Sequence, residues 1–178
     1  MYNNTVFFHK IRDVKDPNRA NKHDAGIDFY VPKFDKEFRD RVEEINKDLS
    51  VVLVGFSSEW SKIVVKPGKR VLIPSGIRVW IVDKSTALIA FNKSGLSTQN
   101  GVTVTAQVVD ADYTGEVHLG IINEGDEDFI IEPDQKLTQF LHMPYIQTSL
   151  SEVTEKQYNN MTQNTDRGQK GFGSSNNK

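Results

Sequence analysis

The residues near the C-terminus whose types could do chemistry are Arg167 to Ser175, which read RGQKGFGSS. Arg167 and the N–H groups of the glycines would suit phosphate oxygens, because glycine lets the backbone approach a ligand closely. Phe172 stands in an otherwise polar tail, where it has no folding role and could stack on a flat ring. These residue types favour a nucleotide ligand. A disordered Gly/Ser tail with one stray aromatic would read the same way, so both interpretations stay open for this segment alone.

A second chemical stretch, VVDADYTGE at residues 108–116, places two carboxylates after an apolar strand. Asp110 and Asp112 would point to opposite faces of a strand, so at most one of them faces a given pocket. A hairpin turn in which the aspartates cap backbone amides is the alternative.

Three shorter stretches add further candidates. Lys93, Ser94 and Gly95 form a turn before a helix-like segment, where a cation, a hydroxyl and free amides could hold one phosphate, although the stretch in isolation favours a Ser-capped turn. Asp28 is flanked by apolar residues on a strand and needs a partner, a metal or water to offset its desolvation. Gln139 interrupts an apolar run, so its amide either binds a ligand or satisfies a core backbone group.

Composition excludes several classes of function. There are no cysteines, so thiolate catalysis and Cys-based zinc sites are excluded, and the four histidines lie far apart and indicate surface or structural roles. The charge is nearly balanced, with 22 basic and 24 acidic residues, and gives no indication of nucleic acid or membrane as a partner. No signal-peptide pattern or membrane-length apolar run is seen, so a soluble intracellular protein is expected.

Most of the chain reads as short strands separated by Gly, Pro, Asn and Asp. This pattern predicts an all-β fold, either a sandwich or a jelly-roll barrel. The expected strands are residues 5–11, 26–31, 63–66, 70–74, 77–82, 87–92, 102–109, 116–123, 129–132 and 136–143.

One segment has helical periodicity instead. Phe34, Phe38, Val42, Ile45 and Leu49 recur at the spacing of one helix face, with charged residues between them. We expect an amphipathic helix laid over the sheet surface, with an exposed docking helix for a protein partner as the alternative. From about residue 149 the chain is polar and reads as a flexible arm.

Taken together in this order, the five chemical stretches resemble the motifs of the trimeric dUTPase family. The resemblance covers nearly the whole chain except about residues 33–62, where the helical segment is inserted. The five motifs are Ala25–Asp28, Lys93–Leu96, Val109–Glu116, Lys136–Gln139 and Arg167–Ser174.

The chain also departs from the family pattern. Lys93 stands where the second motif usually has Arg, which keeps the charge but loses the bidentate fork. Gln107 replaces a usual Gly before the third motif, and Asp134 and Gln135 replace a common Gly-Asp pair before the fourth. Family knowledge gives the inserted helix no role.

The resemblance implies a jelly-roll β barrel at residues 1–148, interrupted by the insertion, and a C-terminal arm at residues 149–178. It also implies a homotrimer in which each active site draws motifs from all three chains. The arm would carry the fifth motif to a neighbouring subunit, which would account for its polar composition, since it would need to become ordered only when ligand is present.

The implied reaction is magnesium-dependent cleavage of dUTP to dUMP and pyrophosphate. Asp110 would be the base for the attacking water, Tyr113 would exclude a ribose 2′-hydroxyl, and Asp28 would hold a water bound to Mg²⁺. The resemblance implies three further groups of substrate-binding residues, which contact the uracil edge, the uracil face and the phosphates. They are Val104, Val108 and Val109 at the uracil edge, Phe172 stacked on uracil, and Lys93, Ser94, Gly95, Gln139, Arg167, Gly173 and Ser174 around the phosphates.

Two other functions are compatible with this scaffold. A dCTP deaminase-related enzyme shares the fold but needs a Thr-Leu-Glu stretch and an Arg-Ser-Ser element, neither of which is evident. A nucleotide-sensing or partner-binding protein could use the inserted helix as its interface.

Overall fold

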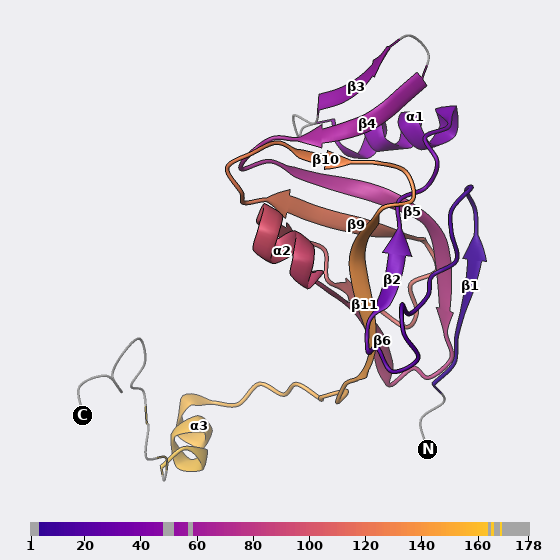
Figure 1. Cartoon of the computed structure of the whole chain (residues 1–178). Helices are drawn as coiled ribbons and strands as arrows, with labels where there is room; N and C mark the ends of the chain where they lie inside the picture. The colour runs from indigo at the N-terminus through magenta and orange to yellow at the C-terminus, as the bar shows by residue number, and fades with distance from the viewer. Residues whose placement is uncertain (1–3, 48–51, 57–58, 164, 166–167, 169–178) are drawn as a thin grey trace. The chain divides into compact units, whose positions relative to one another are not determined.

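The computed structural model describes residues 4–47, 52–56, 59–163, 165 and 168, with 52–56 and 59–61 described by their backbone only (Figure 1). The chain divides into two compact units, Met1–Ile146 and Gln147–Lys178. Within the described residues, the first unit holds every strand and two helices, and the second holds one helix. The elements are β1 (Val6–Lys10), β2 (Ile27–Tyr30), α1 (Lys36–Ile45), β3 (Val52–Phe56), β4 (Glu59–Val65), β5 (Arg70–Ile81), β6 (Thr86–Phe91), α2 (Ser94–Asn100), β7 (Val102–Val104), β8 (Val108–Val109), β9 (Glu116–Asn123), β10 (Phe129–Ile131), β11 (Lys136–Pro144) and α3 (Glu155–Met161).

The strands form three antiparallel sheets, ordered β1-β5-β9-β7, β2-β11-β6-β8 and β10-β4-β3. The predicted β-rich class is therefore confirmed, while the residues described here form open sheets and no closed barrel. All three sheets contribute to one hydrophobic core, with Leu119 of β9, Phe140 of β11 and Ile63 of β4 almost fully buried.

Two of the expected strand divisions differ in the structure. Residues 70–74 and 77–82 form one strand, β5, in which a shift of register between Pro74 and Arg78 replaces the expected turn. Gly76 there has φ 72°, and a Cβ at that position would lie 2.9 Å from Arg12 Cβ, so the irregularity requires glycine. Conversely, residues 102–109 split into β7 and β8, which belong to different sheets.

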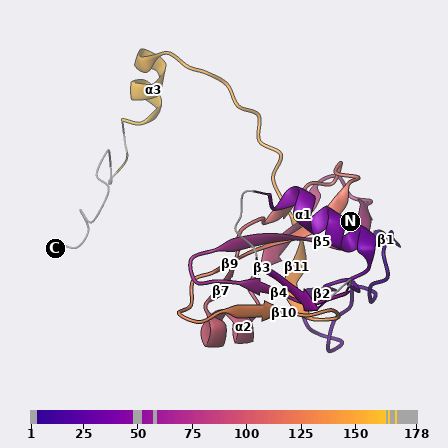
Figure 2. The same ribbon diagram turned by 90° about the horizontal axis from the view of Figure 1, so that it is seen from above.

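The inserted segment contains the predicted helix, α1, which packs against β5 (Figure 2). It begins after Asp35, whose carboxylate accepts a hydrogen bond from the backbone N–H of Phe38 at 2.8 Å. Phe38 and Val42 are completely buried in the core. The helix ends earlier than expected, and Leu49 lies outside the described residues. Because the apolar stripe faces the core of its own chain, it is not free to bind a partner.

The insertion also contains structure that the periodicity did not predict. After α1, the Asn46 side chain donates to Leu72 O and accepts from Leu72 N, both at 2.8 Å, which ties the end of the helix to β5. The strand β3 was missed and β4 begins earlier than expected; the two form a hairpin that pairs with β10.

The C-terminal unit contains α3, a seven-residue helix within the segment expected to be a flexible arm. Its start has a reciprocal capping box between Thr154 and Gln157. None of the helices described is long and apolar enough to cross a membrane.

Candidate functional site

A buried carboxylate between two lysines forms the first part of the site. Asp28 of β2 is 4% exposed, its Oδ1 lies 2.5 Å from Lys93 Nζ and its Oδ2 lies 2.7 Å from Lys136 Nζ. Burial acts to raise the pKa of Asp28, but the hydrogen bonds and charges of Lys136 and Lys93 outweigh it and lower that pKa below its ordinary value. With two cations and one anion, the cluster carries one surplus positive charge and therefore suits an anionic ligand.

An irregularity in β11 brings Lys136 to this cluster. Gln139 pairs with Asp28 and Lys136 pairs with Tyr30, with a shift of register between Lys136 and Thr138. In a regular strand, residues three apart point to opposite faces. The bulge places Lys136 and Gln139 on the same face as Asp28.

Asn92, which follows β6, connects this cluster to its surroundings. Gln139 Nε2 donates to Asn92 O at 2.8 Å, and Asn92 Oδ1 accepts from Val104 N at 2.8 Å. A Cβ on Gly26 would lie 2.1 Å from Gln139 Oε1, so the glycine of the first stretch makes room for this amide. Ser94 and Gly95 are exposed beside Lys93 at the start of α2. Asn92 is a structural member of the site that sequence reasoning did not single out.

The turn after β8 forms the second part of the site. Val108, Val109, Asp110 and Tyr113 line a cavity of about 180 Å³. Asp110 is exposed, and within the described residues no side chain pairs with its carboxylate. Tyr113 Oη donates to Glu116 O at 2.8 Å. A Cβ on Gly115 would lie 2.5 Å from Tyr113 Oη, so this glycine makes room for the tyrosine ring.

Lys84 holds this turn in place and was not predicted from the sequence. Its Nζ donates to Ala111 O at 2.6 Å, lies 3.1 Å from Asp112 Oδ1 and sits 4.0 Å from the centroid of the Trp80 ring. Asp112 is therefore paired, and Asp110 is the carboxylate of this pair that remains open for chemistry.

The two parts of the site lie at opposite ends of β6. Antiparallel pairing puts Val109 opposite Leu88 and Val108 opposite Ile89, so Asp110 follows beside Ala87. Lys93 stands six residues beyond Ala87, which at the rise of an extended strand corresponds to about 20 Å. Val104 belongs to the Lys93 end, where its N–H is already bonded to Asn92. One chain does not bring Asp110 and Lys93 together.

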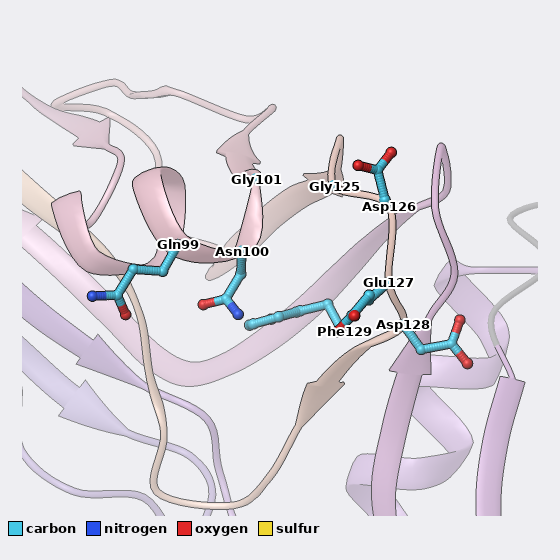
Figure 3. Close-up of a pocket in the computed structure, with 8 residues that line it drawn as sticks. All are labelled: Gln99, Asn100, Gly101, Gly125, Asp126, Glu127, Asp128 and Phe129. Atoms are coloured by element: carbon cyan, nitrogen blue, oxygen red, sulfur yellow. The ribbon is translucent and has the colours of Figure 1, made fainter.

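Another cavity, of about 310 Å³, lies between the end of α2 and the turn joining β9 to β10 (Figure 3). None of the predicted site residues lines it. Figure 3 shows Asp126 and Asp128 pointing in different directions, and in the described part of the chain no three His, Cys, Asp or Glu residues are grouped to hold a metal. This cavity does not belong to the candidate site.

Comparison with known proteins identifies the family. A family model described as dUTPase matches residues 58–176, which is more than half of the chain. The chain belongs to the dUTPase family. Deoxyuridine 5′-triphosphate nucleotidohydrolase of Haemophilus ducreyi is 37% identical over 117 residues, which cover 65% of this chain and 73% of that protein. The corresponding Legionella pneumophila protein is 35% identical over 113 residues, covering 62% and 70%.

Solved dUTPase structures share the fold. A variant of the dUTPase of Staphylococcus phage 80alpha superimposes with a TM-score of 0.70 at 18% identity, covering 97% of this chain and 99% of that one. The dUTPase of phage phi11 of S. aureus gives 0.63 at 17% identity, covering 85% and 97%. At these identities the likeness concerns the fold alone.

Four predicted site residues of the fifth motif, Arg167, Phe172, Gly173 and Ser174, lie outside the described residues.

Asp134, which stands where the family commonly has Gly before the fourth motif, has a simple structural explanation. Its backbone has φ 65°, the left-handed conformation that glycine favours and aspartate tolerates. Its carboxylate pairs with Lys33.

Proposed function

We propose that this dUTPase family member hydrolyses dUTP to dUMP and pyrophosphate, with Asp110 as the general base. The assignment of the base rests on the open Asp110 carboxylate, which lines a cavity of about 180 Å³ and lies two residues before an Asp112 that pairs with Lys84. Family membership and the relatives named deoxyuridine 5′-triphosphate nucleotidohydrolase support the reaction.

In this mechanism Asp110 orients a water molecule at the α-phosphorus and accepts its proton. A bond forms between the water oxygen and the α-phosphorus, the bond from that phosphorus to the oxygen bridging to the β-phosphorus breaks, and pyrophosphate leaves. Tyr113, fixed by Glu116 O, packs against the deoxyribose and leaves no space for a 2′-hydroxyl. The backbone at Val108 and Val109 reads the uracil edge.

Lys93 and Gln139 hold phosphate oxygens with Ser94 and Gly95 at the turn that follows β6. Arg167, Gly173 and Ser174 add phosphate contacts from the arm, and Phe172 stacks on uracil. Interactions of this kind stabilise the charge that develops during phosphoryl transfer.

We also propose that the active site is shared within a homotrimer whose subunits are jelly-roll barrels. A single dUTP cannot place its α-phosphorus at Asp110 and its phosphates at Lys93 of the same chain, since about 20 Å of strand separates them. A second copy would supply the missing half. An apolar cavity of about 330 Å³ beside Asp110, lined in part by the exposed side chains of Val108, Met143 and Tyr145, offers a surface for such a copy.

The resemblance implies that Asp28 holds a water bound to Mg²⁺. Because a lysine ammonium pairs with each of its carboxylate oxygens, Asp28 does not suit direct coordination of the ion. We propose that Mg²⁺ enters with the triphosphate, since magnesium keeps several waters and commonly binds through substrate phosphates. When bound, it would neutralise phosphate charge. A dUTPase variant from phage phi11 has a coordinated structural Mg(II) ion.

The alternative functions receive less support. A partner-binding role through the apolar stripe of α1 conflicts with the complete burial of Phe38 and Val42. A dCTP deaminase-related activity has no supporting residue in the described site.

Pyrophosphate release from dUTP, dCTP, dTTP and UTP tests this proposal. We expect turnover of dUTP and little of the other three.

Asp110→Asn should lower kcat about 10²- to 10⁴-fold while dUTP binding persists. Asp112→Asn is the matched control and should retain most activity, because Asp112 pairs with Lys84 instead of facing substrate. Near-normal turnover of Asp110→Asn would reject Asp110 as the base.

A further inference from the structure

Lys136 has no role in the proposed reaction, yet it contacts the same carboxylate as Lys93. The two ammonium groups divide Asp28 between them, Lys93 at Oδ1 and Lys136 at Oδ2. The Asp28 side chain is 6% exposed, whereas those of Lys93 and Lys136 are 24% and 36% exposed. The carboxylate therefore lies beneath two cations that remain partly open to a ligand.

The pairing has a geometric consequence for Lys93. A guanidinium at position 93 could donate to both oxygens of Asp28 at once, whereas an ammonium acts as a single point charge. In this chain Lys93 satisfies one oxygen only, and Lys136 satisfies the other. With Lys93 alone, the buried carboxylate would form a neutral one-to-one pair and hold that lysine to itself.

We propose that Lys136 is a positioning residue that frees Lys93 to bind the triphosphate, the two lysines together replacing one bidentate arginine. The proposal rests on the proposed function, since it deepens the phosphate half of that site. Lys136 is held for this task from two directions. The β11 bulge turns it toward Asp28, and its Nζ lies 5.7 Å from the centroid of the Tyr30 ring.

A double-mutant cycle tests the inference with the whole protein. The four proteins are the wild type, Lys136→Gln, Lys93→Arg and the double variant. Inorganic pyrophosphate serves as a binding probe in calorimetry, beside KM and kcat for dUTP. In the wild-type background, Lys136→Gln should weaken pyrophosphate binding and raise KM about tenfold, with kcat changed less. In the Lys93→Arg background the same change should cost less than about twofold, because the guanidinium fork satisfies both oxygens.

Two further variants separate this role from general charge effects. Lys136→Arg should behave like the wild type. Lys15→Gln is the matched control, because Lys15 also lies near the Tyr30 ring, at 5.6 Å, but pairs with Asp134 instead of Asp28. It should leave pyrophosphate binding unchanged.

Equal losses from Lys136→Gln in both backgrounds, or no loss in the wild-type background, would overturn the inference. If Lys136→Gln is too unstable to assay, melting temperature becomes the readout, and the double variant should then recover stability. Failure of the proposed function can be distinguished from failure of this inference. A wild type that binds pyrophosphate with this coupling but does not hydrolyse dUTP would reject the activity and support the role of Lys136.

Discussion

The two halves of the site are built differently. At the phosphate end, Lys93 and Lys136 pair with the buried Asp28 carboxylate and neutralise it before any ligand arrives, and Gln139 is hydrogen-bonded to Asn92. At the nucleoside end, Lys84 and Glu116 fix the turn, but Asp110 projects from it into solvent. The charged groups of the phosphate end are paired within one chain, whereas the carboxylate proposed as the base is left open within one chain, as the proposed sharing of the site between subunits would require.

The largest effect that sharpens this contrast should come from removing the arm. A chain ending after Thr165 lacks the fifth motif but keeps all described elements. We expect turnover to fall by about 100-fold or more, comparable with the loss of a positioned donor at a reacting centre. Its melting temperature should stay close to that of the full chain. Full activity in the shortened chain would show that both halves work without the arm.

A smaller effect should follow from crowding the phosphate end. Gly26→Ala places a Cβ where Gln139 Oε1 now lies, so the amide must leave its contact with Asn92. We expect KM for dUTP to rise about tenfold, the usual cost of one charge-assisted hydrogen bond. Steady-state kinetics on dUTP measure it.

The matching change at the nucleoside end is Gly115→Ala, which displaces Tyr113. It should reduce discrimination between dUTP and UTP and leave pyrophosphate binding unchanged. If both glycine variants give the same kinetic pattern, the division into two halves is wrong.

The ion pairs at the phosphate end should also make the stability of the folded protein depend on pH. Because the pKa of Asp28 is lowered in the folded protein, its ionised form contributes stability above the unfolded pKa, near pH 4. That contribution disappears as the pH falls through the folded pKa. Melting temperatures of the wild type and Asp28→Asn should therefore differ most at neutral pH and converge in acid. A constant difference from pH 7 to pH 2 would contradict the described ion pairs.

The smallest effect on activity should come from the insertion, which lies outside both halves. Phe38→Ala removes a fully buried ring and should destabilise the protein by about 3–5 kcal/mol. Turnover per folded molecule should stay within about twofold of the wild type, as denaturant unfolding and kinetics on the same sample can show. A collapse of turnover in folded protein would place α1 in the active site.

Local patterns were enough to predict most strands, the inserted helix and the order of the motifs. The alternation of side chains along a strand predicted the wrong faces or boundaries where the pairing register shifts, because a bulge depends on the partner strand and is not visible in one strand alone. One such shift places Lys136 and Gln139 on the same face, and another lies within the single strand formed by residues 70–81. Lys84 and Asn92 were missed for a related reason, since their partners are backbone carbonyls or distant strands that no local pattern identifies.

Asp28 and Gln139, which the sequence offered as separate candidates, are brought together because they share a strand pair. The distance between Asp110 and Lys93 depends on β6 pairing with both β8 and β11, and sequence spacing gave no sign of it. The resemblance to a family implied that each site draws on several chains, but the separation of Asp110 from Lys93 along β6 follows only from the strand pairing.

Subunit complementation tests the shared site most directly. Asp110→Asn and Lys93→Gln, each nearly inactive alone, are mixed in equal amounts, unfolded and refolded together. If every site takes Asp110 and Lys93 from different chains of a trimer, random assembly should restore about a quarter of wild-type turnover. Activity of the mixture no higher than that of the separate variants, with mixed trimers verified by mass, would contradict the account and place both residues in one chain's site.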